Sequence, residues 1–421
     1  MKKHINLGID NRFQTIAIEE DNLLDVLHQN DIEYDLTGMD AVADSLKKPI
    51  GTKTLTEIIQ PGESVVIVTS DLTRPLPSHQ VLPPILNELE EIGVKDEEIT
   101  IVFALGSHRK QTEAEMRELV GDDIFERYKT VDGDLDDVVH LGETTGGTPI
   151  DIDRTVAEAD RRICLGNIEY HYFAGYSGGA KAIMPGVSTR AAIQANHSNM
   201  THPKATAGNA VDNPVRNDLE EAIQHCPIDF IVNVVLNENK EIIHSVAGHF
   251  IEAHREGCKF LDKLYLKPID QRADIVIASQ GGAPKDLNLY QTQKALDNTK
   301  FAVADGGVVI LVGSCKEGMG EEVFAEWMSE AKDPKELIKR IELEFKLGGH
   351  KAAAIALVME RADIYLVSDM DDDFVRSIFM TPFDNVEDAY QAAREKLGDD
   401  AKVLVMPYGG STLPRVKGEI E

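Results

Sequence analysis

The chain has 421 residues, of which 42% are apolar and 28% charged, a composition typical of a globular protein long enough for two domains. A formal net charge of −30 argues against nucleic acid or an anionic membrane as a partner, because binding phosphates requires a basic surface. The N-terminus lacks the apolar run of a signal peptide and no stretch is long enough to span a membrane, so we expect a cytoplasmic protein.

Short β-branched runs alternate with amphipathic stretches along the whole chain. This pattern is typical of the α/β class, with mainly parallel sheets flanked by helices. In the first part we expect strands at 64–69, 99–105 and 162–166, helices at 82–92 and 113–120, and a hairpin at 228–247 that turns at 237–240. Polar clusters follow the first three strands, and ligands of parallel sheets bind where strands end. We expect these clusters to meet in one crevice, although loops are often polar for no functional reason.

A proline-containing polar connector at 266–270 separates this part from a second α/β pattern. Its strands are expected at 273–278, 308–312, 363–367 and 402–406, and the four aspartates of 369–373 are expected to form a solvated turn. The sequence thus predicts two domains, 1–268 and 269–421. The four cysteines include no C-x-x-C pair, which predicts reduced thiols rather than disulfides or structural zinc; Cys164 and Cys315 are expected in the core.

The segment 171–197, HYFAGYSGGAKAIMPGVSTRAAIQANH, is the most distinctive part of the chain. Its glycines permit close approach of a ligand to the backbone, and Lys181 follows them directly. A Walker phosphate loop is excluded because alanine, not serine or threonine, follows that lysine. We expect a bulky ligand here, with a phosphate, and a Lys181 amine open to covalent modification. From these residues alone, an alternative hypothesis is a pyridoxal-phosphate enzyme in which Lys181 forms the Schiff base.

The polar clusters contain groups suited to proton transfer and carboxylate binding. His108 and His171 are suited to proton transfer because imidazole as a group titrates near neutral pH, although either can also be a capping or structural residue. Arg74 can bind a carboxylate with two parallel hydrogen bonds, or form a surface ion pair with Asp71.

Four motifs together resemble the nickel-dependent lactate racemase family. They are SDLTRP at 70–75, GSHR at 106–109, the glycine-rich segment at 171–197, and YQTQK at 290–294. The resemblance spans residues 70 to 294 and implies a nickel-pincer nucleotide, which is pyridinium-3-thioamide-5-thiocarboxylic acid mononucleotide with nickel. It further implies that this cofactor is covalently bound to Lys181 through a thioamide, and that His197 is the protein's nickel ligand.

The resemblance also implies roles for the other residues. His108 and His171 match the two acid/base catalysts, and Arg74 matches the residue that anchors the substrate carboxylate. Further substrate-binding residues are expected in the second domain: Tyr290, Gln291 and Lys294. Further cofactor-binding residues are expected in the first: Asp71, Thr73, Ser177, Gly178 and Gly179.

The expected activity is racemisation or epimerisation of a 2-hydroxy acid, lactate or a related one, in a cleft between the domains. Hydride leaves the substrate carbon while a histidine takes the hydroxyl proton, and its return to the other face inverts the configuration. The partners implied are the small substrate and the proteins that make the cofactor. A non-catalytic nucleotide carrier is the other alternative. The substrate side chain is not specified by these motifs; its pocket is expected near 347–351.

Overall fold

The computed structural model describes residues 1–237 and 239–419, and its contacts divide the chain into two compact units. One unit is Ile32–Lys263, and the other combines Met1–Asp31 with Leu264–Glu421. The sequence-based division into 1–268 and 269–421 did not anticipate that the first 31 residues group with the C-terminal part. Both units are mixed α/β structures with mainly parallel sheets flanked by helices, as predicted.

The unit Ile32–Lys263 contains a sheet made of six strands. They are β4 (Val65–Ser70), β5 (Ile99–Ala104), β6 (Lys129–Asp132), β9 (Arg161–Asn167), β12 (Phe230–Leu236) and β13 (Ile242–Gly248). Their order is β13-β12-β9-β4-β5-β6, and all neighbours are parallel except β12 and β13. The predicted strands and the predicted hairpin are therefore confirmed. Of the predicted hairpin turn, Glu238 lies outside the described residues.

Two short antiparallel pairs accompany this sheet: β7 (Val138–Glu143) with β8 (Pro149–Asp153), and β10 (Tyr170–His171) with β11 (Gly175–Tyr176). The helices of the unit are α1 (Gly38–Lys47), α2 (Leu55–Ile58), α3 (Ser78–Glu91), α4 (Glu113–Val120), α5 (Asp122–Arg127), α6 (Arg154–Glu158), α7 (Arg190–His197), α8 (Pro214–Ala222) and α9 (Glu252–Tyr265). The short 3-10 turns are η1 (Asp96–Glu98), η2 (Gly179–Ala182) and η3 (Ser198–Thr201).

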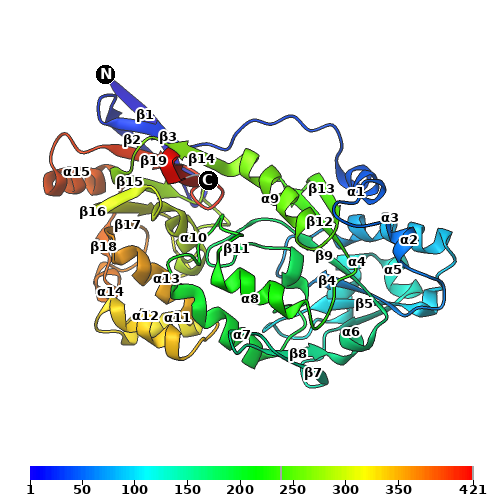
Figure 1. Cartoon of the computed structure of the whole chain (residues 1–421). Helices are drawn as coiled ribbons and strands as arrows, with labels where there is room; N and C mark the ends of the chain where they lie inside the picture. The colour runs from blue at the N-terminus through cyan, green and yellow to red at the C-terminus, as the bar shows by residue number, and fades with distance from the viewer. Residues whose placement is uncertain (238, 420–421) are drawn as a thin grey trace. The chain divides into compact units, whose positions relative to one another are not determined.

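The core of this unit lies between the sheet and α1 to α4 (Figure 1). Helix α3 presents Val81, Ile85 and Leu89 on one face because apolar residues recur there every three or four positions. These side chains pack with Ile67 of β4 and Ile101 of β5. Burying apolar side chains at this face stabilises the sheet and leaves the carboxyl ends of the strands to the polar loops.

The second unit contains a six-stranded sheet in which all neighbours are parallel. Its strands are β3 (Leu23–Val26), β15 (Ala273–Ser279), β16 (Val303–Val312), β17 (Ala362–Val367), β18 (Thr381–Phe383) and β19 (Val403–Met406). The order is β18-β17-β16-β15-β19-β3, so the N-terminal β3 forms one edge beside β19. The hairpin of β1 (Lys2–Ile9) and β2 (Arg12–Glu19) packs on one face of this sheet (Figure 1). Consecutive residues of β15 from Ile275 to Ser279 are all buried, which shows that both faces of the sheet are covered there.

The helices of the second unit are α10 (Leu289–Thr299), α11 (Glu322–Glu330), α12 (Pro334–Leu343), α13 (Gly349–Met359), α14 (Asp372–Ser377) and α15 (Val386–Leu397), and it ends with the 3-10 turn η4 (Lys417–Glu419). Two predictions for this unit were wrong. The connector at 266–270 is largely a strand, β14 (Leu266–Ile269), which pairs in parallel with β20 (Leu413–Val416). Pro268 is tolerated because a two-stranded sheet leaves one side of each strand unpaired.

The run 369–373 is not simply a solvated turn. Asp371 caps α14 by accepting a hydrogen bond from the amide of Phe374 at 2.9 Å, and two aspartates form the first turn of that helix. Acidic residues suit this place because the amides at a helix N-terminus carry partial positive charge.

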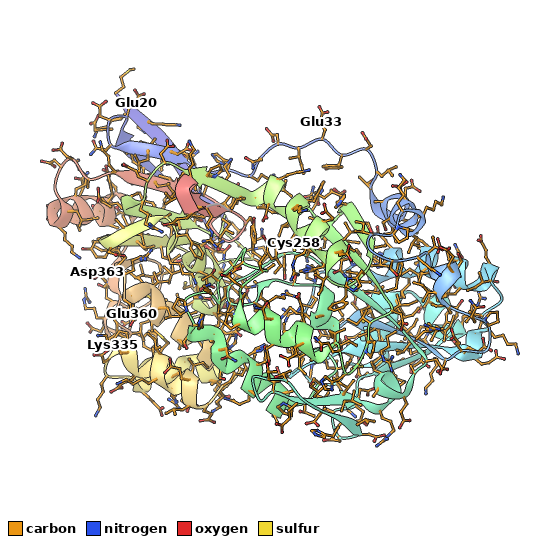
Figure 2. The ribbon with its side chains drawn as sticks, viewed as in Figure 1. Glu20, Glu33, Cys258, Lys335, Glu360 and Asp363 are labelled. Atoms are coloured by element: carbon orange, nitrogen blue, oxygen red, sulfur yellow. The ribbon has the colours of Figure 1, made fainter. Side chains whose placement is uncertain are left out.

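All four cysteines are free and buried, including Cys164 and Cys315, the two that were expected in the core; Cys258 on α9 is labelled in Figure 2. Acidic side chains that contribute to the net charge lie at the surface, among them Glu20, Glu33, Glu360 and Asp363 (Figure 2). Within the described residues, no helix is both long and apolar enough to cross a bilayer.

Candidate active site

Asp71, Thr73 and His108 form one hydrogen-bonded group where β4 and β5 end. Asp71 directly follows β4, is almost fully buried, and accepts a hydrogen bond from Nδ1 of His108 at 2.7 Å through Oδ2. Its Oδ1 accepts from the hydroxyl of Thr73, also at 2.7 Å. Because β4 and β5 are parallel neighbours, the loops that follow them lie side by side. The structure therefore brings these three predicted residues together.

The ionisation of Asp71 fixes the tautomer of His108. Burial raises the pKa of Asp71, but hydrogen bonds from His108 and Thr73 and the charge of Arg74 outweigh it and hold this pKa below its usual value. Asp71 is therefore a carboxylate at neutral pH and can only accept hydrogen bonds. Nδ1 of His108 consequently carries the hydrogen, and Nε2 is the basic nitrogen of the ring.

His171 lies in β10, between the end of β9 and the glycine-rich loop. Its Nδ1 accepts a hydrogen bond from the backbone amide of Ala174 at 3.2 Å, which places the hydrogen of the neutral ring on Nε2. The ring stacks on Tyr172 and contacts the ring of Phe173 edge-on, with centroids 5.5 and 4.5 Å away. These contacts hold the imidazole in one orientation.

The pKa of His171 lies well below its usual value. Removal from water is the main cause, and nearby positive or protonatable groups add to it: Lys181, His197, Arg74 and Arg216. His171 is therefore neutral at neutral pH.

Lys181 lies in η2, with its side chain partly buried. Removal from water, followed by the charges of Arg216 and Arg74, holds the pKa of Lys181 well below its usual value. A lysine amine that is neutral near pH 7 is nucleophilic, whereas an ammonium ion is not. The lowered pKa of Lys181 therefore favours the neutral amine, which is the form that covalent attachment of a ligand requires.

His197 is the last residue of α7 and is buried. Its Nδ1 lies 2.8 Å from Oδ1 of Asn196. Its ring contacts Phe173 edge-on at 4.8 Å, so that Phe173 touches both imidazoles, His171 and His197. The structure thus gathers His171, Lys181 and His197 in one region, as the sequence predicted.

The glycine-rich loop is held by two buried residues that the sequence reasoning missed. Arg216 on α8 is completely buried, and its guanidinium donates to the carbonyls of Ala174 at 3.2 Å and Gly178 at 3.3 Å, and also to that of Tyr176. His254 on α9 donates from Nε2 to the carbonyl of Ser177 at 2.7 Å. Four carbonyl groups of the loop are thereby fixed, which determines where Lys181 emerges.

Two glycines of this loop are required by its geometry. A Cβ atom on Gly175, whose φ is +80°, would lie 2.0 Å from the carbonyl oxygen of Asn209. One on Gly178, whose φ is +77°, would lie 2.7 Å from Oδ1 of Asn233. Side chains at these positions would strain the backbone and push the loop away from its supports.

The sequence predicts that a phosphate binds at the glycine-rich loop, but several polar groups of this loop already form hydrogen bonds within the protein. The Ser177 hydroxyl donates to the carbonyl of Asn167 at 2.7 Å, and the amide of Gly179 donates to Oδ1 of Asn233 at 2.8 Å. The Lys181 amide donates to the carbonyl of Gly178 at 3.3 Å. A phosphate bound here would have to displace these bonds or use other donors.

The remaining predicted residues lie in the second unit, on α10. Lys294 is exposed, while Tyr290 and Gln291 are partly buried. The ring of Tyr290 contacts that of Phe324 at 5.6 Å, and Nζ of Lys351 lies 5.8 Å from its centre.

Among the described residues, no group of three or more histidine, cysteine, aspartate or glutamate side chains is arranged to hold a metal ion. A metal bound by His197 in this part of the chain would therefore need most of its ligands from a cofactor.

The fold and these side chains define an α/β enzyme with acid–base groups at the ends of parallel strands. The model for the lactate racemase N-terminal domain matches residues 9–208, and the model for the lactate racemase C-terminal domain matches residues 269–413. The chain therefore belongs to the lactate racemase family, and it is an isomerase.

Individual relatives agree with this assignment. The chain is 34% identical to a lactate racemase of Thermoanaerobacterium thermosaccharolyticum over 391 residues, which is 90% of this chain and 91% of the relative. It is also 34% identical to a lactate racemase of Lactiplantibacillus plantarum over 418 residues, 96% of this chain and 98% of the relative. The solved lactate racemase apoprotein from T. thermosaccharolyticum superposes with a TM-score of 0.89 at 31% identity, covering 98% of this chain and 100% of the other.

Proposed function

We propose that this protein racemises or epimerises a 2-hydroxy acid, lactate or a close relative, with a nickel-pincer nucleotide attached to Lys181. Support comes from family membership and from one observation above all. The charge of Arg74 lowers the pKa values of Asp71, His171 and Lys181, so one carboxylate-binding side chain lies within electrostatic range of all three groups.

The residues fit the proposed cofactor. A neutral amine at Lys181 suits attachment through a thioamide, which carries no charge in its partly buried place. His197 would hold the nickel through one imidazole nitrogen, and the nucleotide would supply the remaining ligands. When bound, the nickel-bearing pyridinium ring would supply the group that accepts and returns a hydride.

The protein's own residues then have distinct tasks. Arg74 binds the substrate carboxylate with two parallel hydrogen bonds. Nε2 of His108 accepts the hydroxyl proton of one enantiomer, and Asp71 stabilises the imidazolium that results. We assign the proton of the opposite configuration to His171, whose lowered pKa keeps the ring neutral. To accept at Nε2, the ring must give up the bond from the Ala174 amide and carry its hydrogen on Nδ1 instead. Tyr290, Gln291 and Lys294 of α10 are proposed as further substrate-binding residues.

Removing the Cα hydrogen as a proton would be difficult beside a carboxylate anion, because the developing carbanion would add to that negative charge. Removing it as a hydride leaves a planar 2-keto acid instead, to which hydride can return on either face. Proton acceptors for both configurations are what this chemistry requires, and His108 and His171 meet that need.

The test is an assay of purified holoprotein, made together with the cofactor-producing proteins, against single-enantiomer 2-hydroxy acids. Circular dichroism should show lactate or one relative converted to a mixture of both configurations. Replacing both His108 and His171 by alanine should abolish conversion, while His140→Ala should retain it because His140 is an exposed histidine paired with Asp151. Conversion by the double variant, or no conversion of any acid by nickel-loaded protein, would contradict the proposal.

A further inference from the structure

A chain of buried hydrogen bonds leads from the hairpin turn between β7 and β8 to His197. It passes through Asp218 on α8 and Asn196 on α7, both of which are buried. Asn196 is fully buried and bonds directly to His197. Asp218 lies outside the motifs that the sequence singled out, and Asn196 lies within the segment 171–197 but was given no role there.

The hydrogen bonds of Asn196 determine the orientation of its side-chain amide. Its Nδ2 lies 2.7 Å from Oδ2 of Asp218 and 3.1 Å from the carbonyl oxygen of Val215, and both partners can only accept. The NH2 group must therefore face them, which turns Oδ1 toward His197. Because Oδ1 can only accept, Nδ1 of His197 must carry the hydrogen across the 2.8 Å contact.

Asp218 is in turn held by donors from the hairpin. Its Oδ1 accepts from the hydroxyl of Thr144 at 2.5 Å, and its Oδ2 accepts from the hydroxyl of Thr148 at 2.8 Å. Together with Asn196, three donors satisfy a carboxylate that is almost removed from solvent. Its charge polarises the Asn196 amide, which makes Oδ1 a stronger acceptor for the imidazole hydrogen.

From this arrangement we infer that Asp218 and Asn196 are positioning residues for His197, which keep the hydrogen on Nδ1 and present Nε2 as the nitrogen that binds nickel. The inference rests on the proposed function, since the proposed nickel is what Nε2 would bind. A hydrogen-bonded second partner fixes the orientation of a metal-binding imidazole and raises its basicity. Contact of the ring with Phe173 holds the same orientation from the other side.

The first measurement uses the full-length protein without cofactor. Long-range ¹H–¹⁵N spectra of histidine-labelled protein at pH 8 report which ring nitrogen is protonated, and His197→Gln assigns the resonance among the 13 histidines. We expect a protonated Nδ1 and an unprotonated Nε2 for His197. A hydrogen on Nε2 in the unaltered protein would overturn the inference without any variant having to fold.

Variants supply the second measurement. Asn196→Ala removes the acceptor and should yield a mixture of tautomers. From nickel-loaded protein treated with a chelator, it should release nickel about 10- to 100-fold faster. Asp218→Asn keeps the size of the side chain and loses its charge, so its effect should run in the same direction and be smaller. The matched control is Asn199→Ala, an exposed asparagine three residues further along, which should behave as the unaltered protein.

These outcomes separate the inference from the proposed function. If Asn196→Ala and Asp218→Asn both keep the original tautomer and release rate, the positioning role is wrong while the racemase proposal stands. If active protein holds no nickel, the proposed function fails, and with it the metal-binding purpose assigned to Nε2.

Discussion

Two lysines, one in each unit, lie in opposite electrostatic surroundings: Lys351 is buried and Lys181 is partly buried. Lys351 on α13 donates to Oε1 of Gln293 at 2.8 Å and lies 3.9 Å from Oδ2 of Asp297. The charged groups that most affect Lys181 are Arg216 and Arg74, which are cations like itself. Lys351 therefore has a nearby carboxylate to balance its charge, whereas the surroundings of Lys181 oppose its protonation.

This difference is the one we expect between a structural lysine and the proposed reactive lysine. A buried charge with a compensating partner stabilises a defined packing, and removing one member is costly. A buried lysine among cations costs stability, and such strain is typical of functional positions. The comparison leads to predictions that run from loss of activity to a modest change in stability.

Replacing each of the two lysines separately tests the comparison most strongly. Lys181→Ala should reduce turnover to background, because the attachment point of the proposed cofactor is lost, while the fold is kept. Lys351→Met should lower the free energy of unfolding by about 3 kcal/mol, because buried Asp297 loses the cation 3.9 Å away while it keeps the hydrogen bond from Gln293. Turnover and denaturant unfolding measure the two effects. Normal turnover by Lys181→Ala would contradict the assignment of Lys181 as the reactive lysine.

Asp71→Asn tests the hydrogen-bonded pair of Asp71 and His108 in the candidate site. The amide no longer stabilises the imidazolium of His108 or fixes its tautomer, so kcat should fall about 100-fold or more. Asp151→Asn is the matched control, because Asp151 pairs with exposed His140 at 2.6 Å. The measurement is kcat of both variants under steady-state conditions. An equal decrease in kcat for Asp71→Asn and Asp151→Asn would contradict the catalytic role proposed for Asp71.

Arg74→Lys separates charge from geometry. Lysine keeps the positive charge near Lys181 and His171 but cannot form two parallel bonds to a carboxylate. We expect KM to rise about 10- to 100-fold, with a smaller change in kcat, since bonds to charged groups contribute about 1.5–3 kcal/mol. Initial rates over a range of substrate concentrations give both constants. An unchanged KM would show that the substrate carboxylate binds elsewhere.

Lys181→Met should stabilise the cofactor-free protein, and the gain should depend on pH. The pKa of Lys181 is lowered in the folded state, so below the usual value of 10.5 the unfolded chain binds a proton that the folded protein does not. The penalty is therefore present at neutral pH and disappears as pH rises toward 10.5. Denaturant unfolding of both proteins at pH 7 and 9.5 should show the difference narrowing; a constant difference would indicate an effect of packing alone.

Local patterns were sufficient for much of this structure. Buried strands such as β4 and β5 are continuous apolar runs, and polar residues directly after them identified Asp71 and His108. The glycine-rich loop identified Lys181 through its composition. In each case the information lies within a few residues of the site.

Long-range contacts could not be predicted from local sequence patterns. Nothing in the pattern of β3 shows that it pairs with β19, near the other end of the chain. Arg216 and Asp218 lie on α8, whose start is indicated by Asn213 and Pro214. Charged residues on a helix usually face solvent, so their burial depends on partners in distant loops.

The central claim is that Lys181 is the attachment point of a nickel-bearing nucleotide. Peptide mapping by mass spectrometry of active, tryptically digested holoprotein tests it most directly, combined with nickel analysis of the same sample. We expect an uncleaved peptide spanning Lys181 with an added mass, and about one nickel per chain. Full turnover by protein in which Lys181 is unmodified and nickel is absent would contradict the account.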